Sequence, residues 1–404
     1  MTDLVRSSDA RAGVLIVGGG LAAQRACETL RRHGHEGPIR VLAAEADLPY
    51  DRPPLSKEYL AGKAHETALH FRSAGWYAEH DIELLLDRRA LRLDPVAREV
   101  TTSDGTRLTY HRLLIATGST PRRLPIAGGY DNVHELRTLD DARAVRRALG
   151  PRMRLVVIGA GFIGQEVAAT ARSLGAHVTM IEAAAAPLVA VLGARLGHWF
   201  ARLHRDEGID VLLSARIERL HGADSAEAVQ LDDGRLIECD AVVVGIGTVP
   251  ATTWLEGSGL DHDGVCVDTA GRTAIPDVFA AGDASRPLDP QLGTHVRSEH
   301  WEAAARQGAA AARAMLGLEI PPAPPPSFWS DQHGLRIQYL GHAQGADALE
   351  IDGDPEVRDF TATFTRRRQP VAALLVGRPH ALPETRRRIQ DAAAPPPDNE
   401  RKAA

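Results

Sequence analysis

The chain has 404 residues, a formal net charge of −6 at pH 7, 44% hydrophobic residues and 25% charged residues. This length fits two or three domains better than one compact core, and the ordinary hydrophobic content excludes a largely disordered protein. The acidic balance argues against a nucleic-acid-binding protein, and no run of about 18 apolar residues is present to span a membrane.

Two further features bear on location and redox chemistry. The segment from Met1 to Asp9 has neither the apolar stretch nor the cleavage site of a signal peptide, so we expect a cytoplasmic protein. The three cysteines, Cys27, Cys239 and Cys266, form no CxxC or CxxxxC pair. We therefore expect neither a redox-active disulfide nor a metal site, and Cys27 fits a small core residue of a helix.

A first strand–turn–helix–strand unit is predicted over residues 14–42. A short apolar run meets a glycine cluster, an Ala-, Arg- and Glu-rich helical stretch follows, and a second apolar run ends the unit. Gly18 permits the tight turn, Gly20 lets the backbone approach a pyrophosphate, and Ala23 is small enough for close helix–strand packing. Glu45, just beyond the second strand, can accept hydrogen bonds from ribose hydroxyls. The pattern predicts a dinucleotide-binding fold.

β-structure is predicted between this unit and a second one. Residues 99–110 are typical of a hairpin that turns at Asp104-Gly105, and residues 112–119 of a buried strand that ends at a glycine turn. The apolar run then recurs at residues 155–158, again before a glycine cluster and a helical stretch. This internal repeat predicts two similar units, and right-handed crossovers make the sheet of each unit parallel.

The second unit has a complete GxGxxG turn, made by Gly159, Gly161 and Gly164, and Glu182 follows its next strand. One such turn is weak evidence, but two of them, each with an acid after the second strand, predict two dinucleotide sites. Glu182 can bond a free ribose 2′-hydroxyl but would repel a 2′-phosphate. Residues 183–186 are all alanine and offer no arginine to a phosphate, so NADH is favoured over NADPH.

The second unit closes as the first does. A hairpin is predicted around Asp232–Arg235 and a buried strand at residues 241–244. The β-rich run at residues 276–279 then leads into Gly282-Asp283. A turn glycine and an acid at a strand end can hold the ribityl chain of a flavin, although the dipeptide alone is also a common turn.

The C-terminal part is predicted to be a separate α+β region. A proline-rich stretch around residues 319–326 marks its boundary. Four antiparallel strands, a helix and a disordered tail rich in proline and charge are then expected, at residues 334–340, 346–351, 359–365, 370–376, 383–392 and 393–404.

Together these segments resemble the FAD-dependent pyridine nucleotide–disulfide reductase superfamily. Within it they are most similar to the ferredoxin reductases of the putidaredoxin and rhodocoxin reductase type, which serve haem monooxygenases and Rieske dioxygenases. The resemblance extends over about residues 12 to 390. It depends most on six motifs: Leu48-Pro-Tyr-Asp-Arg-Pro-Pro-Leu-Ser-Lys57, Ala116-Thr-Gly118, Leu136-Arg-Thr-Leu-Asp-Asp-Ala142, Ala281-Gly-Asp283, Glu299-His-Trp301 and Phe328-Trp-Ser-Asp-Gln332.

The resemblance implies an α/β fold with two Rossmann-like domains, as in glutathione reductase, and a small C-terminal α+β domain. The expected domains are an FAD-binding domain at 1–122 and 246–320, an NADH-binding domain at 123–245, a Pro-rich linker at 321–327, a C-terminal domain at 328–392 and a disordered tail at 393–404.

It also implies roles for particular residues. Ala22 and Glu45 would contact the adenosine half of FAD, and the backbone of Ala90 its adenine. Arg52, Lys57 and Arg137 would hold the pyrophosphate or line the isoalloxazine. Lys57 would pair with Glu166 beside flavin N5, and these two are the expected catalytic residues. The remaining expected contacts are Asp283 with the ribityl hydroxyls, the Trp301 backbone with the pyrimidine edge, Trp329 near the ring, and further cofactor contacts at Thr117, Gly118, Gly247 and Gly282.

The implied reaction needs no side-chain nucleophile, because hydride passes from NADH to flavin N5 and the cofactors carry the chemistry. The electrons would then pass singly to a [2Fe-2S] or similar ferredoxin that supplies an oxygenase. Ferredoxins are generally acidic, so docking on the FAD-binding and C-terminal domains of a monomer needs a basic patch. Arg366–Arg368 and Arg386–Arg388 are candidates, and an ordinary solvated face explains them equally well.

One segment departs from the family. Relatives usually carry arginines after the position of Glu182, where this chain has Ala186 and Ala190, which puts tight NADH binding in doubt. Disulfide reductase and peroxidase chemistry is disfavoured, because Pro53, Pro54 and Ser56 stand where those enzymes have a cysteine. A diaphorase or monodehydroascorbate-type reductase stays open, as does a redox-sensing interaction protein that resembles apoptosis-inducing factor.

Overall fold

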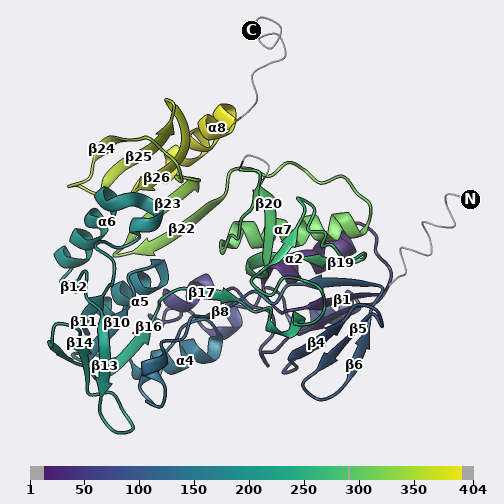
Figure 1. Ribbon diagram of the computed structural model, residues 1–404, viewed down its shortest axis with the longest axis horizontal. Helices are drawn as coiled ribbons and strands as arrows, with labels where there is room; N and C mark the ends of the chain where they lie inside the picture. The colour runs from purple at the N-terminus through teal and green to yellow at the C-terminus, as the bar shows by residue number, and fades with distance from the viewer. Residues whose placement is uncertain (1–12, 290–291, 394–404) are drawn as a thin grey trace, which may run out of the picture. The chain divides into compact units, whose positions relative to one another are not determined.

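The structure is a computed structural model that describes residues 13–289 and 292–393 (Figure 1). The chain forms two compact units, each built from separate segments. The first unit takes in the described residues up to Arg122, Arg137–Arg143 and Gly247–Pro322. The second takes in Arg123–Leu136, Ala144–Ile246 and the described residues from Ala323. The domain boundaries drawn from the sequence stay a prediction, and the tail predicted from residue 393 lies, beyond Ala393 itself, outside the described residues.

A five-stranded parallel sheet forms the centre of the first unit, in the order β19-β7-β1-β2-β3. Its strands are β1 (Val14–Val17), β2 (Ile39–Leu42), β3 (Ile82–Leu85), β7 (Arg112–Ile115) and β19 (Val278–Ala280). Strands such as β1 and β7 are buried along their whole length, as expected for a parallel sheet covered on both faces.

One face of this sheet packs against α2 (Leu21–Arg32) and α7 (Trp301–Met315). Small buried residues line α2, and Cys27 is one of them, as predicted. A Cβ on Gly308 of α7 would lie 2.1 Å from the carbonyl oxygen of Ala22. The two helices therefore approach each other closely through small residues.

The other face packs against a three-stranded antiparallel sheet, β4 (Ala90–Asp94), β5 (Glu99–Thr102) and β6 (Arg107–Thr109). The hairpin predicted at residues 99–110 is confirmed, and β4 adds a strand that the sequence pattern did not reveal. The first unit also contains α3 (Ala74–Glu79), β8 (Ser119–Pro121), β17 (Thr248–Pro250), β18 (Val265–Val267), β20 (Ser285–Asp289) and β21 (Thr294–His295).

The second unit repeats the parallel sheet in the order β12-β11-β10-β16-β9. Its strands are β9 (Val133–His134), β10 (Arg154–Ile158), β11 (His177–Ile181), β12 (Asp210–Leu212) and β16 (Ala241–Val244). Helices α5 (Phe162–Ser173) and α6 (Val189–Asp206) connect them, and α6 is kinked at Gly193. The predicted second hairpin is confirmed as β14 (Ala228–Leu231) and β15 (Leu236–Glu238), with β13 (Ile217–His221) beside it. Helix α4 (Leu139–Ala148) begins in the first unit and ends in the second.

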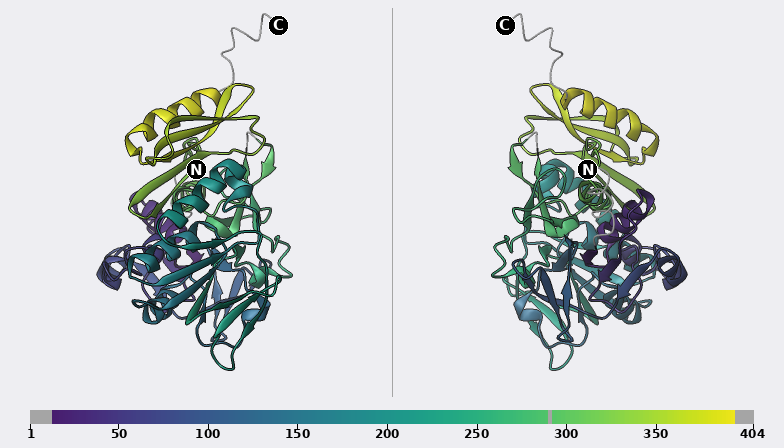
Figure 2. Two further views of the ribbon diagram at one scale, coloured as in Figure 1. Left: turned by 90° about the vertical axis from the view of Figure 1, so that its left-hand side faces the viewer. Right: turned by 90° about the vertical axis from the view of Figure 1, so that its right-hand side faces the viewer.

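A five-stranded antiparallel sheet completes the second unit, in the order β22-β23-β26-β25-β24. Four of its strands and the helix match the predicted elements, and Figure 2 shows α8 in yellow along this sheet. The bounds are β22 (Ser327–Gln332), β23 (Leu335–Gly341), β24 (Ala348–Asp354), β25 (Asp359–Arg366), β26 (Gln369–Val376) and α8 (Leu382–Ala393). Strand β22 was not predicted, because its polar residues follow a proline-rich stretch and it becomes regular only by pairing with β23.

A hydrophobic core joins this antiparallel sheet to helix α6. Apolar residues of α6, including Trp199 and Phe200, pack with Ile337, Phe360 and Leu374 of the sheet. The predicted α/β class, with two similar parallel-sheet folds and a smaller C-terminal α+β part, is confirmed. Among the described residues, no helix combines the length and apolar character needed to cross a membrane.

Candidate dinucleotide-binding sites

The first glycine turn lies between β1 and α2 and has two different kinds of glycine. Gly18 has a φ of +123°, and a Cβ there would lie 2.0 Å from the carbonyl oxygen of Ala116. Gly20 is the N-cap of α2, has no side chain to cap the helix, and an added Cβ would meet no protein atom within 4 Å. The protein itself therefore requires glycine at position 18 but leaves space at position 20, where an anion can approach the helix N-terminus.

Glu45 lies beside two residues of the Leu48–Lys57 motif. Its carboxylate forms an ion pair of 2.6 Å with Arg52 and accepts a short hydrogen bond from the Tyr50 hydroxyl. Arg52 also donates to the backbone carbonyl of Arg137 at 2.6 Å. Burial raises the pKa of Tyr50 above its ordinary value, so this hydroxyl keeps its proton. Tyr50 lies within the Leu48–Lys57 motif but was not among the residues expected at the site.

Arg137 connects this group to Asp283. The guanidinium donates to Asp283 at 2.8 Å and to the Ser119 carbonyl at 3.1 Å, and the Ser119 hydroxyl donates to the same carboxylate oxygen at 2.7 Å. Three of the residues expected to contact FAD, Arg52, Arg137 and Asp283, are thus linked in one polar chain. Ser119 belongs to the same chain, and only its position two residues after Thr117 could have suggested it.

The other residues expected at this site also lie in the first unit. Ala22, Ala23 and Ala90 are buried. The Thr117 hydroxyl is buried and has no partner among the described residues, which fits a group that bonds to a ligand. Gly118, Gly247 and Gly282 have positive φ values, as their turns require.

Lys57 and Trp301 lie near Asp51 in this unit. The Lys57 ammonium donates to the Pro53 carbonyl at 3.0 Å, and the Trp301 indole donates to the Asp51 carboxylate at 2.6 Å. Burial raises the pKa of Asp51, an effect that the indole bond and the Lys57 charge oppose. Asp51 is a second residue of the Leu48–Lys57 motif that was not among those expected at the site.

The second glycine turn, between β10 and α5, also contains both tightly packed glycines and one with open space around it. A Cβ on Gly159 would lie 2.4 Å from the Gly245 carbonyl oxygen, and one on Gly164 would lie 2.1 Å from the Gly159 carbonyl oxygen. A Cβ on Gly161 would find its nearest neighbour only at 3.9 Å. Two glycines therefore serve close packing, and the middle one faces open space at the N-terminus of α5.

Glu182 lies directly against this turn. Its carboxylate accepts hydrogen bonds from the backbone N–H groups of Ala160 and Ala184, both at 2.8 Å. Ala186 is fully buried, and a Cβ on Gly197 of α6 would lie 2.8 Å from its side chain, while Ala190 is exposed. The carboxylate therefore lies at the glycine turn, and residues 183–190 after it include no cation.

Glu166 and Trp329 belong to the second unit. Glu166 is buried on α5 and accepts a hydrogen bond of 2.6 Å from the Ser330 hydroxyl of β22. The Arg336 guanidinium lies 5.8 Å from the centre of the Trp329 ring. Since Lys57 and the flavin segments belong to the first unit, the Lys57–Glu166 pair and the place of Trp329 beside the flavin stay predictions.

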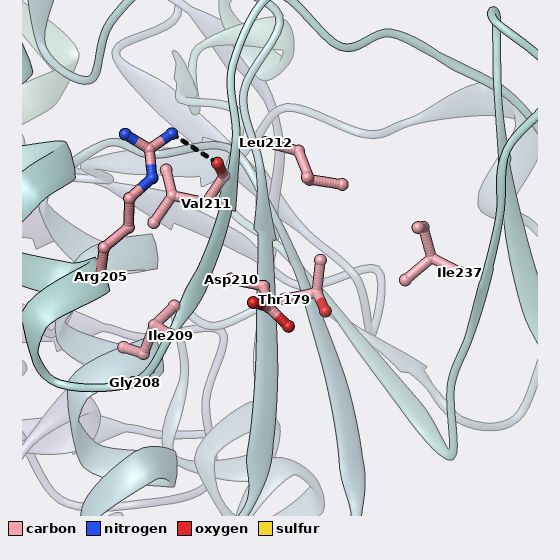
Figure 3. Close-up of a pocket in the computed structure, with 8 residues that line it drawn as sticks. All are labelled: Thr179, Arg205, Gly208, Ile209, Asp210, Val211, Leu212 and Ile237. Carbon is pink, nitrogen blue, oxygen red and sulfur yellow. Dashed lines mark hydrogen bonds between the residues drawn. The ribbon is translucent and has the colours of Figure 1, made fainter.

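The pocket drawn in Figure 3 contains none of the residues expected to bind a cofactor. It has a volume of about 380 Å³ and includes Thr179, Arg205 and Asp210 on its wall. The Arg205 guanidinium donates to the Val211 carbonyl at 2.7 Å. The two glycine turns, not this pocket, are the candidate sites.

The cysteines offer no reactive thiol near pH 7. Burial raises the pKa of Cys27 to about 12 and that of Cys239 to about 11, and it also raises the pKa of Cys266. All three are free. Over residues 13–289 and 292–393, no group of His, Cys, Asp or Glu side chains has the arrangement of a metal site.

Comparison with known proteins shows matches over nearly the whole chain. A family model described as pyridine nucleotide-disulphide oxidoreductase matches residues 12–308, and one described as reductase C-terminal matches residues 327–403. The anthranilate 1,2-dioxygenase system ferredoxin–NAD(+) reductase component of Burkholderia cepacia is 40% identical over 350 residues, which cover 86% of each chain. Putidaredoxin reductase of Pseudomonas putida is 34% identical over 95% of this chain and 93% of its own.

Solved structures agree with these matches. The crystal structure of the covalent putidaredoxin reductase–putidaredoxin complex superposes with a TM-score of 0.92 at 34% identity, over 94% of this chain and 93% of that one. The crystal structure of Fdr9 superposes with a TM-score of 0.85 at 39% identity, over 94% of this chain and 95% of that one.

Proposed function

Because the chain belongs to the pyridine nucleotide-disulphide oxidoreductase family, whose cofactors are FAD and NAD(H), we propose that it is a ferredoxin reductase. It takes electrons from NADH and passes them through FAD to a [2Fe-2S] or similar ferredoxin that supplies an oxygenase. One observation carries the proposal: two glycine turns, each with an open glycine at a helix N-terminus, occur in a chain whose relatives over most of its length are ferredoxin reductases.

The first glycine turn is proposed to hold FAD. The space at Gly20 admits the pyrophosphate, and Arg52 and Arg137 supply positive charge in the same unit. Glu45 is placed to accept from the adenosine ribose. Asp283 and the Thr117 hydroxyl, which has no partner among the described residues, are placed to bond the ribityl chain. These residues are proposed to orient the cofactor.

The second glycine turn is proposed to hold NADH. Gly161 leaves space for the pyrophosphate, and Glu182 is placed to accept from the adenosine ribose. A 2′-phosphate would be repelled by this carboxylate, and the alanines at positions 183–186 offer it no counter-charge. NADH is therefore preferred over NADPH.

Bound FAD supplies the chemistry that accepts an electron pair from NADH and releases electrons one at a time. Lys57 contributes a positive charge that stabilises negative charge on the reduced ring, and Glu166 is the acid proposed to pair with it. Burial raises the pKa of all three cysteines, and none of them is among the residues proposed to bind FAD. The electrons are therefore proposed to pass directly from the flavin to the partner.

The partner surface is proposed to include two arginine groups of the C-terminal part. Arg367 and Arg368 in the turn between β25 and β26 are exposed, as are Arg387 and Arg388 on α8. These cations suit an acidic ferredoxin. Docking on the FAD-binding and C-terminal domains, a monomeric state and a cytoplasmic location belong to the same proposal.

The decisive experiment is NADH-driven reduction of cytochrome c by the FAD-loaded protein, with and without an added [2Fe-2S] ferredoxin. We expect rapid reduction that depends on the ferredoxin. A redox-sensing interaction protein is the second candidate, which the absence of cations at Ala186 and Ala190 favours. Slow turnover with any ferredoxin, combined with dimerisation on addition of NADH, would support that candidate and overturn the proposal.

A further inference from the structure

A series of three hydrogen bonds in the second unit, two of them buried and one partly buried, runs from the β22–β23 turn to the second glycine turn. His204 of α6 is fully buried, with Nδ1 2.9 Å from His333 Nε2 and Nε2 2.9 Å from Gln165 Oε1. Gln165 of α5 is also fully buried, and its Nε2 donates to the Ala160 carbonyl oxygen at 2.8 Å. These hydrogen bonds therefore join the β22–β23 turn, α6, α5 and the second glycine turn.

All three hydrogen bonds are donated in the same direction, from His333 towards the Ala160 carbonyl. The Ala160 carbonyl can only accept, so the amide nitrogen of Gln165 faces it and Gln165 Oε1 faces His204. His204 must then carry its hydrogen on Nε2 and accept on Nδ1, and His333 must donate from Nε2. Burial lowers the pKa of His204 to about 3 and also lowers that of His333. Both rings are therefore neutral near pH 7, as this direction requires.

The last of these hydrogen bonds, from Gln165 to Ala160, fixes a peptide group of the glycine turn. Gln165 holds the carbonyl of Ala160, and Glu182 holds its N–H at 2.8 Å. The Ala160 carbonyl and the Gly161 N–H share one planar trans peptide group and point in opposite directions. Fixing the carbonyl thus also fixes the Gly161 N–H, which lies at the N-cap of α5. Backbone donors at this position bind phosphate oxygens.

We propose that Gln165, His204 and His333 are positioning residues that orient the Ala160–Gly161 peptide for the pyrophosphate of NADH. The inference rests on the proposed assignment of this turn to NADH. Since His333 belongs to the C-terminal part of the polypeptide, that part contributes to the affinity for NADH through these hydrogen bonds.

Two substitutions of Gln165 test the proposal in the FAD-loaded protein. Gln165→Met removes both hydrogen bonds at similar volume, so we expect the Kd for NAD⁺ and the KM for NADH to rise about fivefold. FAD content and kcat should stay close to wild type. Gln338→Met, also in the second unit but outside the hydrogen-bond chain, is the matched control and should leave the Kd unchanged.

Gln165→Glu supplies a signature that a packing role would not show. An ionised carboxylate cannot donate to the Ala160 carbonyl, whereas a protonated one can. We expect the affinity of this variant for NAD⁺, measured by calorimetry, to improve as the pH falls, unlike that of the wild type. The neighbouring titratable and charged groups, whose own titration the wild-type profile reports, are His204, His333, Glu182, Glu166, Glu207 and Arg358.

A third set of variants separates this inference from the proposed function. His333→Ala, in a half-buried turn, removes the outermost donor and should raise the Kd about twofold even if the Gln165 variants do not fold. Suppose that Gly161→Ala abolishes NAD⁺ binding while the Gln165 and His333 variants bind NAD⁺ as the wild type does. The positioning role is then wrong and the proposed NADH site stands. If Gly161→Ala also binds normally, the proposed site itself is wrong.

Discussion

Arg137 shows how single residues bring distant parts of the first unit together. Its backbone carbonyl accepts from Arg52, and its side chain bonds both Ser119 and Asp283. The Arg137–Asp283 pair is mostly shielded from solvent, with side-chain exposures of 21% and 9%. Screening by water is therefore weak, and the arginine is held rigidly beside the acid that is proposed to bind the ribityl chain.

Lys57 is the residue whose proposed role is most directly measurable. Lys57→Ala should leave FAD bound, because the other proposed contacts remain, but should slow reduction of the flavin by NADH about tenfold or more through loss of a fixed positive charge. Stopped-flow absorbance measures this rate. Lys63→Ala, which removes an exposed lysine of the same segment, is the control. An unchanged rate for Lys57→Ala would remove the residue from the mechanism.

Glu182 is expected to set the choice of nucleotide. Glu182→Ala should lower the ratio of kcat/KM for NADH over NADPH about tenfold, because repulsion of the 2′-phosphate is lost. The two carboxylate oxygens each hold one N–H group, of Ala160 and of Ala184, and the amide of Glu182→Gln can accept only one of these bonds. The Kd for NAD⁺ of both variants, measured beside the ratio, therefore reports how much of the effect comes from the turn. A ratio that stays at the wild-type value in both variants would count against the ribose assignment.

Each strand–turn–helix junction contains glycines with different roles. Gly18→Ala would place a Cβ 2.0 Å from a backbone carbonyl, so the protein without FAD should lose about 3 kcal/mol or more of stability. Gly20→Ala meets no protein atom within 4 Å and should fold normally but retain little FAD. Thermal denaturation and flavin absorbance distinguish the two effects. A Gly20→Ala protein that purifies with a full complement of FAD would contradict the proposed place of the pyrophosphate.

Helix α6 is also expected to make stability depend on pH. Burial lowers the pKa of His204 from 6.5 to about 3, so between these values the unfolded chain binds a proton that the folded protein does not. Stability should therefore be lost as the pH falls below about 6.5, by up to about 1.4 kcal/mol per pH unit. Thermal melting between pH 7 and pH 5 measures this. His204→Asn should show a shallower dependence, and equal slopes for variant and wild type would exclude His204 as the source. His35, whose pKa burial lowers to about 4, contributes in the same direction in both proteins.

For the whole molecule, the net charge of −6 makes any attraction to an acidic partner a local matter. Charge reversal at Arg387 and Arg388 should slow ferredoxin reduction about tenfold at low salt, and added salt should reduce the difference. Reduction of a small acceptor such as ferricyanide should be unaffected. The same reversal at Arg146 and Arg147 of α4 controls for net charge. Equal effects of the two pairs would place the docking surface elsewhere.

The sequence by itself determined the features that depend on neighbouring residues. The two GxG turns, their strands, the acids after them and both hairpins follow from spacing and from runs of apolar residues. Six further motifs, which begin with Leu48–Lys57 and end with Phe328–Gln332, indicated the family and its cofactors. Only the tertiary structure decided which distant side chains meet. Arg137 and Asp283 are 146 residues apart and His204 and His333 are 129 apart, and strand β22 becomes regular only when β23 pairs with it. No local pattern encodes such contacts, because they form only when separate elements pack into one core and bring their polar groups within hydrogen-bonding distance.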